Sequence, residues 1–92
     1  MMYFVELDQE AENHLELHIK AGNKILLKRI YRLFTELENH PRIGTGKPHI
    51  LRYEKKEIWS RRIDDRHRML YTIVSNKVTV IVISLWGHYG DK

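Results

Sequence analysis

Cysteine is absent from the chain, and this absence excludes disulfide bonds, thiolate catalysis and zinc sites built on cysteine. Long apolar runs are also missing, since none approaches the roughly 20 residues that a membrane-spanning helix needs. The first residues, MMYFVELDQEAE, lack the basic start and the long apolar stretch of a signal peptide. We therefore expect a cytoplasmic protein with no membrane anchor, whose chemistry uses His, carboxylate, Arg, Lys, Tyr or Ser side chains.

Length and composition predict one small folded domain over residues 1–92. A chain of 92 residues can form one hydrophobic core, but it is too short for a second domain. Hydrophobic residues make up 42% of the chain and charged residues 30%, which is typical of globular and not of disordered proteins. The chain should therefore fold.

Charge is distributed unevenly along the chain. The sequence has 16 Lys and Arg residues against 12 Asp and Glu, a formal net charge of +4. Residues 1–16 contain carboxylates but no Lys or Arg, whereas residues 47–68 are rich in Lys and Arg. This asymmetry favours a basic face that binds a polyanion such as RNA. A solvated surface without a partner explains the same net charge equally well.

Two helices are predicted in the first half of the chain. A short strand at Tyr3–Leu7 is followed by Asp8, a suitable N-cap for a helix that ends at Gly22. Asn23 can cap a second helix, which Pro41 ends. Apolar residues recur about one turn apart on each helix, so each should bury one stripe. These stripes are Ala11, Leu15 and Ile19 on the first helix, and Leu26, Ile30, Leu33, Phe34 and Leu37 on the second.

The second half of the chain has the period of two that is typical of strands. Residues 41–49, PRIGTGKPH, have no periodicity and should form a loop. Four strands follow, in HILRY, EIWSRRI, HRMLYTIV and KVTVIVISLW, and the last is apolar on both faces, as expected for the middle of a sheet. The order β-α-α-β-β-β-β predicts an α+β fold, with two N-terminal helices packed on one face of a mainly antiparallel sheet.

Residues 59–71, WSRRIDDRHRMLY, place four arginines and a histidine between two aromatic residues. Side chains alternate across a strand, so Arg61 and Arg62 should face opposite sides, as should His67 and Arg68. The exposed members would form a cationic surface suited to phosphate contacts and base stacking. Alternatively, the carboxylates of the same segment pair with the arginines, and the hairpin is merely soluble.

Five of the six histidines fall into two groups, on helices or at strand ends, and His67 lies in the hairpin described above. His14 and His18 lie one helical turn apart and could form half of a metal site, but no further ligands follow at a suitable spacing. We interpret them as surface residues and predict no metal and no other cofactor. His40 is typical of a helix C-terminus, where the dipole favours it. His49 and His88, in contrast, each lie at a strand end.

His49 and His88 could lie at the same edge of the sheet, near the arginines. Arg68 has apolar neighbours along its strand, so its guanidinium should be partly desolvated and should need a carboxylate or a phosphate as partner. Two imidazoles and one guanidinium around a phosphate could cleave RNA. One imidazole would take the 2′-OH proton, the guanidinium would stabilise the pentacoordinate phosphorus, and the other imidazole would protonate the leaving 5′-oxygen.

Four motifs of the C-terminal half resemble those of the Txe/YoeB toxins, a branch of the RelE superfamily of bacterial toxin–antitoxin modules. They are GKP, WSRRI, HRxxY and the late HY pair, and the resemblance extends over nearly the whole chain. It implies a compact microbial-RNase-like fold and a toxin that cleaves mRNA in the ribosomal A site. It also implies an antitoxin of the YefM/Phd type, and contact with operator DNA only through the antitoxin complex. Relatives can form dimers, so a homodimer is a further candidate assembly.

The resemblance also implies roles for individual residues. Arg68 would stabilise the transition-state phosphate, His88 would be the general acid, and Tyr89 would position the scissile nucleotide. Lys47 and Arg62 would hold backbone phosphates or ribosomal RNA. With the aromatic and basic residues of the hairpin added, the candidates for RNA or ribosome contact are Lys47, Trp59, Arg61, Arg62 and His67.

The chain departs from the family pattern after GKP, where the family usually has a glutamate as general base and this chain has His49. A neutral imidazole can accept the same proton. We therefore predict that His49 is the base, His88 the acid and Arg68 the electrostatic stabiliser. Two other functions remain open: a toxin that blocks the A site without cleavage, and an interaction module that completes an antitoxin complex on DNA.

Overall fold

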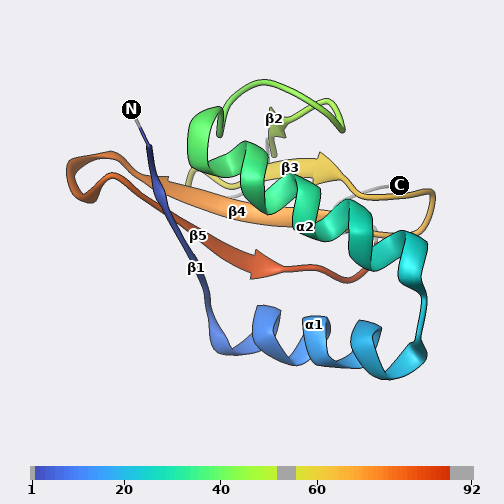
Figure 1. Ribbon diagram of the computed structural model, residues 1–92. Helices are drawn as coiled ribbons and strands as arrows, with labels where there is room; N and C mark the ends of the chain where they lie inside the picture. The colour runs from blue at the N-terminus through green and yellow to red at the C-terminus, as the bar shows by residue number, and fades with distance from the viewer. Residues whose placement is uncertain (1, 52–55, 88–92) are drawn as a thin grey trace.

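The computed structural model describes residues 2–51 and 56–87, and the predictions for His88 and Tyr89 lie outside these described residues. Two helices pack against a five-stranded sheet, with α2 lying across the sheet and α1 alongside β5 (Figure 1). This arrangement confirms the predicted α+β fold. The elements are β1 (Phe4–Leu7), α1 (Gln9–Ala21), α2 (Lys24–Asn39), β2 (His49–Ile50), β3 (Trp59–Arg62), β4 (Arg68–Val74), the 3₁₀ turn η1 (Ser75–Lys77) and β5 (Thr79–Ser84).

The sheet has the strand order β1-β5-β4-β3-β2. Neighbours in the run from β2 to β5 pair antiparallel, while β1 pairs parallel with β5. Thus β5 has a neighbour on each side, as its apolar sequence predicts. The parallel pairing joins the first strand to the last one described.

Both helices begin at the predicted caps. Asp8 Oδ1 accepts a hydrogen bond from Ala11 N–H at 3.0 Å, and Asn23 Oδ1 accepts one from Leu26 N–H at 3.0 Å. Gly22 ends α1 in the left-handed conformation, with φ of 72°, which glycine adopts without steric cost. The two helices are therefore separate elements that join at Gly22 and Asn23.

The core lies between α2 and the sheet. The apolar stripe of α2 packs as predicted. None of the described helices is long and apolar enough to cross a membrane. On α1 the prediction was wrong at Ile19, which is 49% exposed, whereas His18 is only 2% exposed. The buried side of α1 therefore runs through Ala11, Leu15 and His18, at spacings of four and three residues.

Candidate functional site

The strand register places His49 and Arg68 on the same face of the sheet. His49 lies opposite Ser60 on β3, and Ser60 lies opposite Leu70 on β4. Arg68 precedes Leu70 by two residues, so both side chains project from the same side as His49. Since neighbouring strands are about 4.8 Å apart, the Cα atoms of His49 and Arg68 are on the order of 12 Å apart. Long side chains from the two positions can therefore reach one phosphate group.

His49 is exposed and holds a definite hydrogen bond. Its Nδ1 lies 3.0 Å from the Lys47 carbonyl oxygen. A carbonyl oxygen can only accept, so Nδ1 must carry the proton. In the neutral ring, Nε2 is then unprotonated and can accept a proton from a ligand. This tautomer is the one that a general base needs.

Arg68 is half-buried at the start of β4. Its backbone N–H donates to the Gly87 carbonyl oxygen at 3.0 Å. This bond continues the contact between β4 and the chain that leaves β5. The bond thereby holds Gly87, which immediately precedes His88 in the sequence, next to Arg68.

Three histidines hold the chain between β5 and His88. His18 Nε2 donates to the Leu85 carbonyl oxygen at 2.9 Å, and Leu85 N–H donates to His14 Nδ1 at 3.1 Å. Gly87 N–H donates to His67 Nδ1 at 2.9 Å. The Trp86 ring stacks on the His18 ring at a centroid distance of 4.9 Å. We call these three residues, His14, His18 and His67, the histidine clamp.

The histidine clamp corrects the prediction that His14 and His18 are surface residues. His14 and His18 are not free surface residues, since His18 is buried and the side chain of His14 is only 17% exposed. His67, predicted to contact RNA, is half-buried and binds the backbone of Gly87. No group of three or more His, Cys, Asp or Glu residues in the described part of the chain could hold a metal ion.

Arg61 is fully buried, so the structure corrects its predicted RNA contact. Its Nη1 donates to Glu36 Oε1 at 3.0 Å, and its Nη2 donates to the carbonyl oxygens of His40 and Ile43, each at 3.0 Å. These bonds tie β3 to the end of α2 and to the loop that follows it. Arg61 is thus a structural residue, and Arg62 beside it is the exposed member of the pair.

Trp59, predicted to contact RNA, packs against an aromatic residue of β4. Its ring packs parallel to the ring of Tyr71, with a centroid distance of 6.4 Å and an interplanar angle of 15°, and its Nε1 is buried. The side chain is only partly exposed and packs against the core. Trp59 therefore takes part in the core and is only partly available at the surface.

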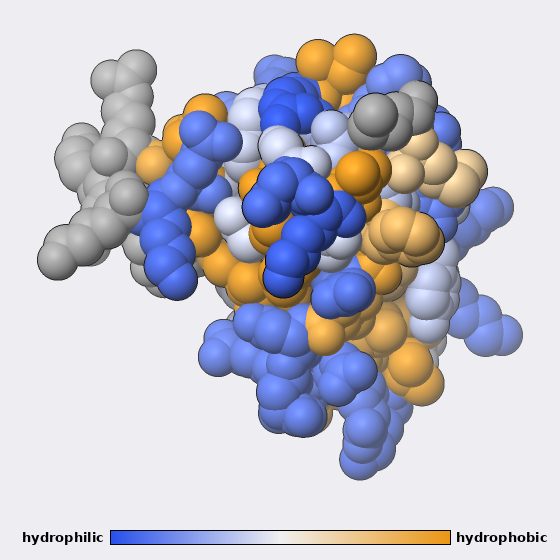
Figure 2. Space-filling model, turned by 90° about the vertical axis from the view of Figure 1, so that its left-hand side faces the viewer, coloured by the Kyte–Doolittle hydropathy of each residue, from blue (hydrophilic) through white to orange (hydrophobic). Residues whose placement is uncertain are grey.

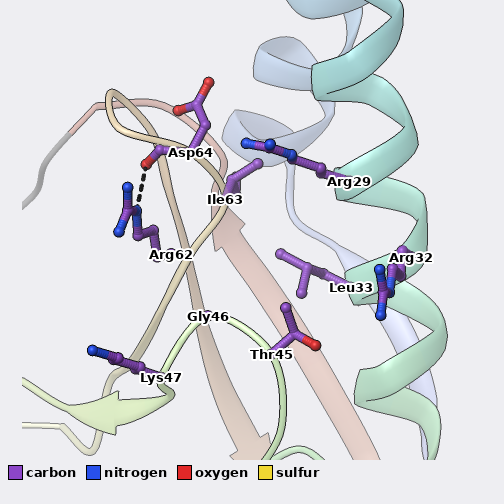
Figure 3. Close-up of a pocket in the computed structure, with 9 residues that line it drawn as sticks. All are labelled: Arg29, Arg32, Leu33, Thr45, Gly46, Lys47, Arg62, Ile63 and Asp64. Atoms are coloured by element: carbon purple, nitrogen blue, oxygen red, sulfur yellow. Dashed lines mark hydrogen bonds between the residues drawn. The ribbon is translucent and has the colours of Figure 1, made fainter.

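Four basic side chains line a groove between α2 and the β3–β4 hairpin (Figure 3). Arg29 and Arg32 come from α2, and Lys47 and Arg62 come from the opposite wall. We call the groove lined by these four side chains the basic groove. The sequence predicted Lys47 and Arg62 as RNA contacts but not the two arginines of α2, which lie among apolar core positions and carry no motif. Arg62 itself pairs with Asp65 and donates to the Asp64 carbonyl oxygen at 3.3 Å.

The surface seen from the left-hand side of Figure 1 is a mixture of hydrophilic and hydrophobic residues (Figure 2). Orange apolar atoms lie between blue hydrophilic side chains over much of this face. Two large apolar residues near the start of the chain, Met2 and Phe4, are 64% and 70% exposed. The charged side chains of the chain therefore do not cover every face of the molecule.

A family model described as the YoeB-like toxin of bacterial type II toxin–antitoxin systems matches residues 7–89. The chain belongs to this family. It is 38% identical to Toxin YoeB of Mycobacterium bovis over 80 residues, which are 87% of this chain and 93% of the relative. Toxin RelK of Mycobacterium tuberculosis matches with the same identity and coverage. The resemblance seen in the sequence motifs is therefore confirmed.

Solved structures agree with the fold of this YoeB-like toxin. A YoeB/ParE toxin from Agrobacterium tumefaciens matches with a TM-score of 0.84 at 24% identity, over 94% of this chain and 99% of that one. The YoeB dimer of Staphylococcus aureus matches with a TM-score of 0.79 at 25% identity, over 97% of this chain and 100% of that one. This YoeB-like toxin is thus the toxin component of a type II toxin–antitoxin system.

Two carboxylates of the YoeB-like toxin are held ionised next to the site. Burial raises the pKa of Asp64, but hydrogen bonds from the backbone N–H groups of Arg66 and His67, with the positive charges of His67 when its ring is protonated and of Arg29, outweigh burial and hold the pKa below 3.8. Asp64 therefore fixes the turn that carries His67. It is also the one carboxylate among the described residues that line the basic groove.

The other carboxylate is Glu36, the partner of Arg61. Burial raises the pKa of Glu36, but the hydrogen bond from Thr45 N–H and the charges of Arg61 and Arg32 outweigh burial and hold the pKa below 4.5. Glu36 thus anchors the loop that carries Gly46 and Lys47. No local pattern indicated this role, because Glu36 lies 25 residues from Arg61.

Proposed function

We propose that this toxin is a ribosome-dependent mRNA endonuclease that inhibits translation in the cytoplasm. One observation carries the proposal: His49 and Arg68 share a face of the sheet, and Gly87, which precedes His88, is bonded to the backbone of Arg68. This arrangement supports a site in which a base, an arginine and an acid surround one phosphate. Membership of the YoeB-like toxin family supports the same reading.

In the proposed reaction, His49 Nε2 takes the proton of the ribose 2′-OH. The 2′-oxygen then forms a bond to the phosphorus, and the bond from phosphorus to the 5′-oxygen breaks. Arg68 stabilises the extra negative charge of the pentacoordinate phosphorus. His88 gives a proton to the leaving 5′-oxygen, so the products are a 2′,3′-cyclic phosphate and a 5′-hydroxyl. Tyr89 positions the scissile nucleotide, and this chemistry needs no metal.

The basic groove offers a path for the RNA backbone next to that site. Arg62 lies opposite Arg68 in the β3–β4 pair, and Lys47 precedes His49 by two residues. Both groove residues therefore adjoin residues of the proposed site. Phosphates bound along the groove would bring the neighbouring phosphate to His49 and Arg68, and such contacts position the RNA without reading its sequence.

We further propose that a YefM/Phd-type antitoxin binds and inhibits this toxin, and that the complex, not the toxin alone, contacts operator DNA. A YoeB–YefM complex of Staphylococcus aureus contains a toxin with this fold, with a TM-score of 0.78. A homodimer is a further proposed assembly, and the YoeB of the same organism forms one. Titration of operator DNA with toxin, antitoxin and their mixture tests the DNA contact, and a specific shift by the toxin alone would contradict it.

Mapping of mRNA 3′ ends on programmed ribosomes tests the endonuclease. The wild-type toxin should produce discrete ends inside the A-site codon, and Arg68→Ala should abolish them. The released fragment should carry a 2′,3′-cyclic phosphate. If the toxin stalls ribosomes and leaves the mRNA intact, the protein is an A-site blocker and the proposed chemistry is wrong. Free mRNA without ribosomes serves as the control substrate.

A further inference from the structure

Residues Leu85–Gly87 are held mainly by imidazole groups. Leu85 is held through both its N–H and its carbonyl oxygen, by His14 and His18 of α1, and Gly87 N–H is held by His67 of the β3–β4 turn. The partners are 67 to 71 residues apart in the chain for the α1 contacts. Side chains from two separate elements therefore converge on three consecutive residues.

The direction of each hydrogen bond fixes the protonation of two rings. His14 Nδ1 and His67 Nδ1 both accept from a backbone N–H, so neither nitrogen can carry a proton. Both rings must therefore be neutral while these bonds exist. His18 differs, because its Nε2 donates to a carbonyl oxygen and this bond survives in either charge state. Protonation of His14 or His67 would turn an acceptor into a donor aimed at another donor.

Charged and titratable groups face the histidine clamp from several elements. Glu10 Oε2 lies 3.9 Å from His14 Nε2, and Asp64 accepts a hydrogen bond from the backbone N–H of His67. The centroids of the His18 and His67 rings are 4.8 Å apart. Arg68 follows His67 in the chain, and Arg29 lies near Asp64. Asp8 lines the same cavity as His14 and Glu10.

The Trp86 ring closes this cluster from outside. It stacks on His18 and lies 4.9 Å from the centroid of His67 and 6.1 Å from that of His14, while 47% of its surface stays exposed. Its backbone N–H also donates to Ser84 Oγ at 3.3 Å. The ring thus contacts all three imidazoles and stacks on His18, the buried member of the clamp.

We propose that the histidine clamp consists of positioning residues that hold Leu85–Gly87 beside Arg68 while His14 and His67 are neutral, and that protonation releases this segment. Because His88 follows Gly87 directly, release removes the fixed starting point from which the proposed general acid is presented. The effect on cleavage rests on the proposed endonuclease function. The effect on Leu85 and Gly87 does not.

Asparagine and alanine variants distinguish the hydrogen-bond acceptor at positions 14 and 67 from the ability of that acceptor to become protonated. Asparagine places a side-chain oxygen close to the position of histidine Nδ1 and accepts a hydrogen bond at every pH, whereas alanine offers no acceptor. The variants are therefore His14→Asn and His67→Asn, with His14→Ala and His67→Ala as their matched partners. His40→Ala is the control, because the His40 side chain is exposed and outside the clamp.

Amide hydrogen exchange of Leu85 and Gly87, measured by NMR and corrected for intrinsic rates, reports the clamp without any catalysis. In the wild-type protein the protection of both amides should fall at least about tenfold between pH 7.5 and pH 5, the range in which imidazoles titrate. The Asn variants should keep their protection at pH 5. The Ala variants should lose it at both pH values while amides of β4 stay protected, which shows that the fold is intact.

Cleavage on programmed ribosomes gives the second measurement. The Ala variants should lower kcat by about 10²-fold, as expected when a reacting group is misplaced by about 1 Å, with little change in KM. Asn variants should retain most of the activity and should lose less of it at low pH. If the wild-type amides of Leu85 and Gly87 stay protected at pH 5, or the Ala variants protect them, the clamp proposal is wrong. If the amides respond as expected and no variant, the wild type included, cleaves mRNA, the endonuclease proposal fails instead.

Discussion

Arg61 and Arg62 are consecutive in the sequence, but Arg61 is completely buried against Glu36 and Arg62 is exposed at the basic groove. The alternation of side chains along β3 produces this difference, because adjacent residues face opposite sides of the sheet. The face with α2 receives Arg61, together with Met69 opposite it. Two residues of the same chemical type therefore have separate tasks, one in stability and one on the surface.

Arg61→Ala should strongly destabilise the fold. The change removes three hydrogen bonds, leaves the carbonyl oxygens of His40 and Ile43 without this donor, and should lower the free energy of unfolding by about 3 kcal/mol or more. Arg62→Ala, one residue away, should change it by no more than about 0.5 kcal/mol. Urea unfolding measures both, and equal effects would show that the buried pair does not hold the loop to β3.

Acid should destabilise the protein through Glu36. Since folding lowers the pKa of Glu36, its contribution is present above about pH 4.5 and is lost as pH falls through the lower, folded-state pKa. The variant Glu36→Gln keeps an acceptor for Thr45 but no charge. It should be less stable than the wild type at pH 7 and should lose less stability between pH 5 and pH 3. Thermal unfolding across this range measures how steeply stability falls with pH. An equal fall in the variant and the wild type would show that Glu36 plays no part.

Tyr71 should titrate late in the folded protein. Burial raises the pKa of the Tyr71 phenol above its usual value of 10.0, although the charges of Arg61 and Arg42 oppose the increase. Its hydroxyl donates to the Pro41 carbonyl oxygen at 2.7 Å, a bond that the ionised form cannot make. The stability linked to this group is therefore present below pH 10 and is lost as pH rises further. Absorbance at 295 nm follows the ionisation of the tyrosines. Compared with the wild type, Tyr71→Phe should lose the signal of one phenol, and this loss should fall in the part of the curve at the highest pH.

His49→Ala should lower cleavage while ribosome binding stays nearly unchanged. The variant loses the proposed base, so kcat should fall by about 10²–10⁴-fold. In the native protein the pH profile should be bell-shaped, whereas the residual activity of the variant should lose the limb that belongs to the base. Filter binding to ribosomes supplies the control. Cleavage equal to that of the wild type would assign the base to another residue, with Glu57 or His67 next in line.

The arginines of α2 should contribute to ribosome affinity through salt-dependent binding of phosphates. Replacement of Arg29 and Arg32 by Gln should weaken binding and reduce the slope of log K against log salt by about one for each phosphate that is no longer neutralised. Lys20→Gln is the matched control, because Lys20 is exposed on α1 and pairs with Glu16 at 3.2 Å. Binding isotherms at several salt concentrations measure both slopes. If both variants give the same slope of log K against log salt, the basic groove does not contact the ribosome.

The sequence predicted those features that depend on local chemistry and periodicity. Asp8, Gly22 and Asn23 mark the helix ends because each cap acts within three or four residues, and the apolar run of β5 identifies an interior strand. The apolar neighbours of Arg68 along its strand likewise fit the half-buried position of this residue in β4. Such signals need no knowledge of distant contacts.

The features that the sequence missed depend on pairs far apart in the chain. Arg61 meets Glu36 across 25 residues, and His18 meets Leu85 across 67. The side that each residue faces is set by a long-range packing choice, and a one-residue change in register would reverse it. For His18 a signal existed, because Ala11, Leu15 and His18 share one helical face. For Arg61 no local pattern distinguished it from Arg62.

Because β1 pairs with β5, the sheet cannot be completed in the order in which its strands are synthesised. Chains are made from the N-terminus, so β1 leaves the ribosome first and has no sheet neighbour until Thr79–Ser84 follow. The same delay applies to His14 and His18, whose partner Leu85 is made after β5. A growing chain therefore cannot complete this sheet, or the contacts of Leu85 with α1, until Thr79–Ser84 and Leu85 have been translated.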